Sequence, residues 1–146
     1  MTSCLTSCNS LQGGKGISVL VTFDFGGFMN NKVKGTQFER EVCEELAKRG
    51  YWVHFMSPDN TGAQPFDIIA VKYGVAFAMD CKTCDAKVFS INRLEDNQIM
   101  AFEKWLSCGN NMPFLMVKHE NVIYCIPYRE LEEKGKVVLN ADYRWE

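Results

Sequence analysis

The 146-residue sequence contains no apolar run of the length that a membrane span requires. Such a span needs about 18 or more successive apolar residues. The N-terminal region has one lysine before a broken apolar stretch, without the cleavage site of a signal peptide. Hydrophobic residues make up 47% and charged residues 23% of the chain, as in one globular domain with a core. We therefore predict a cytoplasmic protein with no membrane partner.

The sequence also lacks the usual patterns of zinc, redox and serine-hydrolase sites. It has two histidines, and Cys81-Lys82-Thr83-Cys84 has no second CxxC or histidine pair beside it. No glycine-rich phosphate loop or Ser-His-Asp order is present. The seven cysteines are odd in number, and several fall inside predicted strands and helices. We expect reduced thiols and interpret the lone CxxC as structural.

An excess of positive charge is missing as well, since 16 lysines and arginines stand against 18 aspartates and glutamates. The net charge of −2 supplies no general attraction to nucleic acid. A nucleic-acid function would therefore depend on local groups of basic residues.

Residues 1–28 are rich in Ser, Thr, Gly and Cys, and we expect an irregular extension with a strand-like period only at 17–23. One hypothesis is that the natural protein starts at Met29, because Gly26-Gly27-Phe28-Met29 reads as a translated ribosome-binding site and start codon. The alternative is a genuine arm. We expect 29–146 to be a single domain.

Regular patterning begins after Met29. Thr36 is predicted to be the N-cap of a helix that ends at Gly50, because Glu39 stands at the capping-box spacing. The further predicted elements are a strand at 51–56, two strands within 65–82, a helix at 92–108, strands at 114–118 and 122–126, and a helix at 128–134. This order, αβββαββα, predicts an α/β fold in which helices flank a mixed sheet.

The two central strands carry an aspartate at either outer end. A two-residue turn at Tyr73-Gly74 would bring Asp67 opposite Asp80. Directly opposed Cβ atoms lie roughly 4.5–5.5 Å apart, so two carboxylates would repel each other unless something neutralises them. Lys82 shares the face of Asp80, and Cys81 points to the other face. The alternative is two solvated strand ends with Lys82 as a surface counter-ion.

Two adjacent carboxylates beside a lysine have a specific chemical use. Carboxylate oxygens bind hard divalent ions such as Mg²⁺. The lysine stays free to orient or deprotonate a water molecule, or to hold a phosphate, while the ion stabilises negative charge that develops at phosphorus.

Two sequence motifs resemble those of a known family of nucleases. Pro65-Phe66-Asp67 followed by Asp80-Cys81-Lys82 resembles the PD-(D/E)xK signature of the restriction-endonuclease-like nucleases. The segment from Lys34 to Glu41 resembles the G-x-x-FE opening helix of Holliday-junction resolvases of the RecU and Hjc kind. Asn97-Gln98 resembles the HQ pair of the RecU group, with asparagine in place of histidine, and 113–117 resembles the strand after it.

The resemblance implies the roles of the site residues. Glu39, Asp67 and Asp80 would bind Mg²⁺, with Mn²⁺ as a substitute, and Lys82 and Gln98 would complete the catalytic site. It also implies a homodimer that places two active sites on a four-way DNA junction and nicks two strands symmetrically, as in phage or bacterial recombination. The chain departs from these resolvases in having Asp80 where they usually have glutamate, and in lacking a long insertion. Two alternatives stay open: another PD-(D/E)xK nuclease (restriction, nicking or end-processing), or a catalytically silent DNA-binding module.

Basic and polar residues near these motifs are the predicted DNA contacts. They form a rim around the acidic site in one interpretation and ordinary solvated faces in the other. The predicted contacts are Lys32, Lys34, Arg40, Ser57, Thr61, Lys87 and Arg93.

Overall fold

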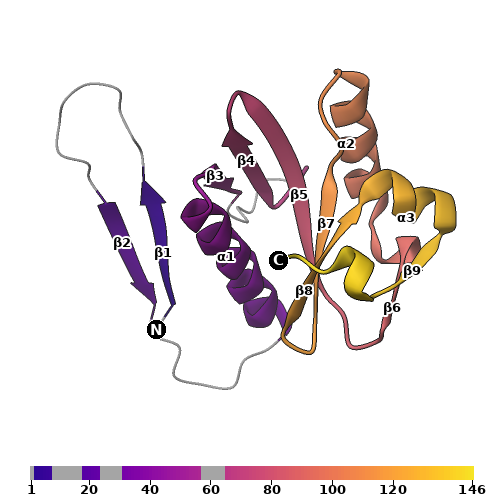
Figure 1. The fold of residues 1–146 in the computed structure, drawn as a ribbon, viewed down its shortest axis with the longest axis horizontal. Helices are drawn as coiled ribbons and strands as arrows, with labels where there is room; N and C mark the ends of the chain where they lie inside the picture. Colours follow the sequence, from indigo (N-terminus) through magenta and orange to yellow (C-terminus); the bar gives the residue numbers. More distant parts are fainter. Residues whose placement is uncertain (1, 8–17, 24–30, 57–64) are drawn as a thin grey trace.

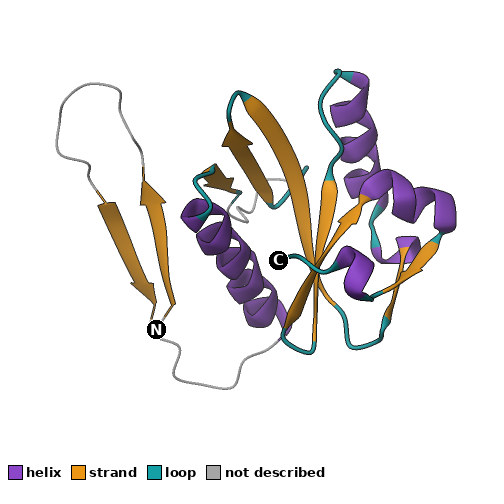
Figure 2. Ribbon diagram, viewed as in Figure 1, coloured by secondary structure: helices purple, strands orange, loops and turns teal. Residues whose placement is uncertain are grey.

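The structure, a computed structural model, describes residues 2–7, 18–23, 31–56 and 65–146, and side chains within the last two ranges from residue 36 onward. Its centre is a five-stranded mixed sheet (Figures 1 and 2). In spatial order the strands are β3 (Trp52–Phe55), β4 (Ile68–Lys72), β5 (Val75–Thr83), β7 (Phe114–His119) and β8 (Val122–Pro127). β5 and β7 run parallel, and the other neighbouring pairs are antiparallel.

Helices cover both faces of this sheet, which confirms the predicted fold class. Helix α1 (Asn31–Lys48) packs on one face through Phe38, Val42 and Leu46. Helices α2 (Asp96–Ser107) and α3 (Tyr128–Lys134) pack on the other face, as Figure 1 shows. The antiparallel strands can be joined by short turns, whereas the parallel pair β5 and β7 needs the long crossover that contains α2.

Helix α1 begins at Asn31, so the prediction of Thr36 as its N-cap is wrong. The helix runs through Gly35, because an interior glycine costs only about 1 kcal/mol relative to alanine and does not end a helix. The predicted end is close to the observed one: Gly50 has a φ of 85°, and the N–H of Tyr51 donates to the carbonyl of Leu46. This left-handed glycine ends the helix and starts the chain toward β3.

Helix α2 begins later than predicted, at Asp96. Leu94 is extended, with φ −89° and ψ 139°, and it separates a short 3₁₀ helix, η1 (Ile91–Arg93), from α2. Glu95 is the N-cap, and its N–H donates to Oε1 of Gln98 at 3.0 Å. The capping pair at 95 and 98, rather than Asn92, thus starts the helix.

The hairpin of β4 and β5 follows the predicted register. Tyr73 and Gly74 both have positive φ, 52° and 75°, as a two-residue type I′ turn requires. The ladder runs from Lys72 opposite Val75 to Ile68 opposite Met79. It ends there, one pair before the predicted pairing of the two aspartates.

The structure contains several short elements that the sequence analysis does not predict. β6 (Val88–Ser90) pairs with β9 (Lys136–Val138), and each is only three residues long. A second 3₁₀ helix, η2 (Ala141–Tyr143), follows β9. Within 1–28, β1 (Thr2–Ser7) pairs with β2 (Ser18–Phe23). The strand-like period expected at 17–23 coincides with β2, whereas β1 and the pairing were not predicted. The hypothesis that the native protein starts at Met29 stays a prediction.

Among the described residues, no helix is both long and apolar enough to cross a membrane.

Candidate active site

Asp80 lies at the centre of the site, in β5, with 1% of its surface exposed. Its two carboxylate oxygens accept from Nε2 of Gln98 on α2, at 3.2 and 3.1 Å. Nζ of Lys82, two residues further along the same face of β5, lies 3.3 Å from Oδ2. A buried carboxylate thus has one amide donor and one ammonium group as neighbours.

Asp67, the residue directly before β4, lies beside Asp80. Its N–H donates to the carbonyl of Met79 at 3.1 Å, and its Oδ2 accepts from the N–H of Cys81 at 2.8 Å. The regular ladder ends at Ile68 and Met79, one pair before the two aspartates, but the side chains of Asp67 and Asp80 still contact each other, as the predicted pairing expects. The electrostatic result is the one expected, because the Asp67 carboxylate still acts on the Asp80 carboxyl.

Glu39 faces this pair from α1. Burial and the Asp67 carboxylate raise its pKa to about 7, and the positive charges of Lys82 and Arg40 oppose that rise. Residue 39 is next to Phe38, whose burial in the core fixes the rotation of the helix. The hydrophobic stripe of α1 thereby directs Glu39 toward the strands that carry the aspartates.

Repulsion and desolvation dominate the electrostatics at Asp80. Burial, followed by the charge of Asp67, raises the pKa of the Asp80 carboxyl to about 8, against the lowering effect of Lys82. Around neutral pH a proton or a cation is therefore needed to neutralise the carboxylates. Perturbed carboxyl groups that share one site are typical of functional positions.

The donor set fits a hard divalent ion. Mg²⁺ usually keeps several waters and binds to one or two carboxylates together with substrate phosphate oxygens, and Asp67 and Asp80 can supply such a pair. Across the described part of the chain, no three His, Cys, Asp or Glu side chains form a group that could by itself enclose a metal ion. A joint ligand set of Glu39, Asp67 and Asp80 therefore stays a prediction.

The structure gathers only part of the predicted DNA rim. Arg40 lies on α1 close enough to act on Glu39, and the Arg93 guanidinium donates to the carbonyl of Thr83 at 3.0 Å, beside Lys82. Lys87 is exposed in the loop between β5 and β6. Two of the remaining predicted contacts, Ser57 and Thr61, lie outside the described residues. The other two, Lys32 and Lys34, lie in α1, where the side chains of these residues are not described.

One charged pair near the site had no role in the sequence analysis. Lys118, at the end of β7, forms an ion pair with Glu41 on α1. The two residues are 77 positions apart in the chain. Only the parallel register that places Lys118 beside Thr83 brings them together, so no local pattern signals the pair.

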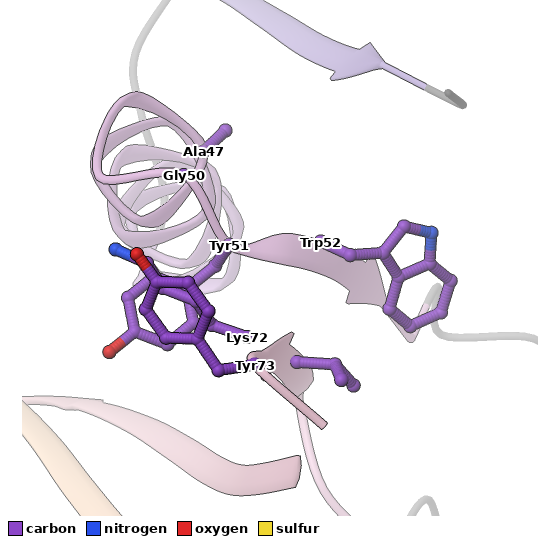
Figure 3. Close-up of a pocket in the computed structure, with 7 residues that line it drawn as sticks. Ala47, Gly50, Tyr51, Trp52, Lys72 and Tyr73 are labelled. Atoms are coloured by element: carbon purple, nitrogen blue, oxygen red, sulfur yellow. The ribbon is translucent and has the colours of Figure 1, made fainter. Parts of the chain in front are cut away.

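A pocket lies at the end of the β4–β5 hairpin that is away from Asp80, around Tyr51, Trp52, Lys72 and Tyr73 (Figure 3). Lys72 donates to the carbonyl of Arg49, and its Nζ lies 5.1 and 5.2 Å from the two tyrosine ring centroids. Among the described residues that line this pocket there is no carboxylate to act as a ligand for a hard cation. Trp52 is 49% exposed, since β3 is an edge strand.

Comparison with known proteins agrees with this geometry. Residues 30–145 match the profile of the archaeal Holliday junction resolvase (Hjc) family. The chain belongs to the Hjc family. A search of curated proteins found no significant match.

Two solved structures share the fold of this Hjc family member. Hjc from Archaeoglobus fulgidus, a Holliday junction resolvase of an archaeal hyperthermophile, is 21% identical, with a TM-score of 0.59 over 77% of this chain and 91% of that one. The bacterial homing endonuclease I-Ssp6803I is 16% identical, with a TM-score of 0.54 over 80% of this chain and 88% of that one. The restriction-endonuclease-like fold and the PD-(D/E)xK resemblance read from the sequence are confirmed.

Proposed function

We propose that this protein is a Mg²⁺-dependent, structure-selective DNA endonuclease that resolves four-way junctions by paired symmetric nicks. The observation that carries the proposal is the buried Asp80 carboxyl, which lies between Asp67, Lys82 and Gln98 in a chain of the Hjc family. The Asp80 carboxyl is kept out of solvent next to another carboxylate, an arrangement that costs folding free energy unless a cation is bound.

The residues of the site divide the chemistry among them. Asp67 and Asp80, with Glu39 beside them, would hold Mg²⁺, for which Mn²⁺ can substitute; when bound, the ion supplies positive charge against the charge that develops on the phosphoryl oxygens. Lys82 is placed to orient a water molecule, accept its proton or hold a phosphate oxygen. Gln98 holds the Asp80 carboxylate in one orientation through two hydrogen bonds.

The proposal includes a homodimer, because two nicks related by symmetry require two copies of one site. It also includes the cytoplasm as the compartment. Among the residues whose side chains are described, the five cysteines have free thiols, which fits a reducing environment: Cys43, Cys81, Cys84, Cys108 and Cys125.

A second candidate function is cleavage of linear duplex DNA at defined sites. Two observations favour it: the fold is shared with a homing endonuclease, and Asp80 stands where the resolvases usually have glutamate. In that case the site chemistry is the same and the substrate differs.

The test is cleavage of a labelled synthetic four-way junction beside linear duplex and single-stranded DNA, with Mg²⁺ and with EDTA. We expect symmetric, Mg²⁺-dependent nicks in the junction alone, and their loss in Asp80→Asn. Reproducible cuts in linear duplex would support the second function. Binding of the junction without cleavage in Mg²⁺ or Mn²⁺ would overturn both nuclease functions in favour of a silent DNA-binding module.

A further inference from the structure

A pocket of about 290 Å³ lies near the candidate active site, on the sheet face that α1 covers. The described residues that line it supply a cation, an anion, an aromatic ring and three neutral hydrogen-bonding side chains. These are Lys118, Glu41, Phe38, Gln37, Thr83 and Asn121.

The pocket and the active site share two structural elements. In the parallel ladder of β5 and β7, Thr83 pairs with Lys118 at the position after Lys82. On α1, Gln37 and Glu41 are one helical turn apart and lie on one flank, whereas Glu39 lies between them in sequence and faces elsewhere. Because side chains alternate along β5, Thr83 lies on the sheet face opposite to Lys82, so a DNA backbone held at the active site would reach the pocket by continuing around the end of β5.

Four side chains of the lining can donate hydrogen bonds to a phosphodiester, and one, Glu41, would repel it. Lys118 is a cation, and the side chains of Gln37, Thr83 and Asn121 can each donate a hydrogen bond to an acceptor-only phosphate oxygen. Glu41 is the anion among the described residues of the lining, and it is the ion-pair partner of Lys118. Both side chains are partly exposed, 26% for Lys118 and 42% for Glu41, so solvent weakens the pair.

We infer that this pocket binds a DNA phosphate near the one that is hydrolysed, with Lys118 as a positioning residue and Glu41 as its competitor. The inference rests on the proposed function and deepens it. In the free protein Glu41 neutralises Lys118. In the complex the phosphate replaces Glu41 as the partner of the ammonium group. DNA that cannot place a phosphate in this pocket obtains no binding energy from Lys118, because Glu41 keeps the ammonium group neutralised. Non-specific binding of DNA is therefore weak, since the chain has a net charge of −2.

The test is the equilibrium affinity for a labelled four-way junction across a salt series, in an Asp80→Asn background that prevents cleavage. We expect Lys118→Ala to weaken binding by about 3–10-fold and to reduce the salt slope by about one. Glu41→Gln should tighten binding by a similar factor and steepen the slope. In Glu41→Gln combined with Lys118→Ala, the gain should disappear. Glu45→Gln, one turn along α1, is the charge-matched control and should change little.

The double variant separates a local effect from a general one. A gain from Glu41→Gln that persists without Lys118 would overturn the inference, since removal of a negative charge would then act through space alone. Unchanged affinity in both single variants, with circular dichroism confirming folding, would show a structural tether and also overturn it. Failure of the Asp80→Asn parent and of wild type to bind any DNA would overturn the proposed function itself, a result distinct from the other two.

Discussion

Gln98 joins the start of helix α2 to the buried carboxylate of Asp80. Its Oε1 accepts from the N–H of Glu95, and its Nε2 donates to both Asp80 oxygens, at 3.2 and 3.1 Å. An amide suits this position because it carries an acceptor and two donors on one planar group. The helix cap and the site geometry therefore depend on the same side chain.

Gln98→Glu should lower cleavage by about 10-fold or more at neutral pH. The glutamate keeps the shape and the acceptor for Glu95, but it places a negative charge where Asp80 has its donor, and it raises the pKa of Asp80 further. The rate of junction cleavage measured against pH should show partial recovery at higher pH. Asn92→Asp, which adds the same charge at an exposed position, is the control. An unchanged pH profile in Gln98→Glu would show that the amide does not position Asp80.

Lys82→Met should reduce cleavage by about 10²-fold or more, the usual range for a group that transfers a proton. Methionine keeps much of the length of the side chain and loses the ammonium group 3.3 Å from Asp80. Single-turnover cleavage of a four-way junction measures the effect. Lys72→Met, in the same hairpin at the end away from Asp80, is the matched control. Wild-type rates in Lys82→Met would remove this lysine from the mechanism.

Without metal, the free energy of unfolding should fall as pH rises from about 4 to about 8. The folded-state pKa of Asp80 is about 8 and that of Glu39 about 7, against ordinary values of 3.8 and 4.5. The native state holds protons in this range that the unfolded chain releases, so the stabilisation is present below about 4 and is lost through about 8.

Urea unfolding in EDTA at several pH values measures this dependence. Asp80→Asn should flatten it and stabilise the metal-free protein at pH 8, by on the order of a few kcal/mol, because one pKa unit corresponds to about 1.4 kcal/mol. Asp142→Asn, at an exposed position, should leave the dependence as in wild type. A pH dependence in Asp80→Asn equal to that of wild type would contradict the assigned charge state.

Mg²⁺ binding should release protons near neutral pH and weaken as pH falls. The ligand carboxyls must lose their protons before they bind the ion, since a carboxylate binds a metal in its ionised form. Calorimetric titration with Mg²⁺ in two buffers of different ionisation enthalpy gives the number of protons released. Asp67→Asn should weaken binding, because it removes one ligand. Binding that is equally tight at pH 6 and pH 8, with no proton release, would argue against a site built on Asp80.

Part of the fold could be predicted because its signals are local. The turn at Tyr73-Gly74 fixes the hairpin register through five pairs, and the four-residue spacing of Phe38, Val42 and Leu46 identifies the buried face of α1. The start of α1 was misplaced, since Gly35 and Thr36 resemble a helix start locally and the helix continues through both. The three-residue strands β6 and β9 gain their stability from pairing with each other, so neither is visible alone.

The sequence by itself determined which residue types the candidate site contains: two aspartates and a lysine at the ends of adjacent strands, a glutamate on the first helix and a glutamine on the second. Tertiary structure alone decided which atoms meet. Asp67 accepts from the backbone N–H of Cys81 and also contacts the Asp80 carboxyl, and Gln98 reaches Asp80 because α2 packs on the far side of the sheet from α1. Lys118 and Glu41 meet only through the parallel register of β5 and β7. The physical reason is that periodicity and turn chemistry act over a few residues, whereas burial and repulsion depend on every element around a group.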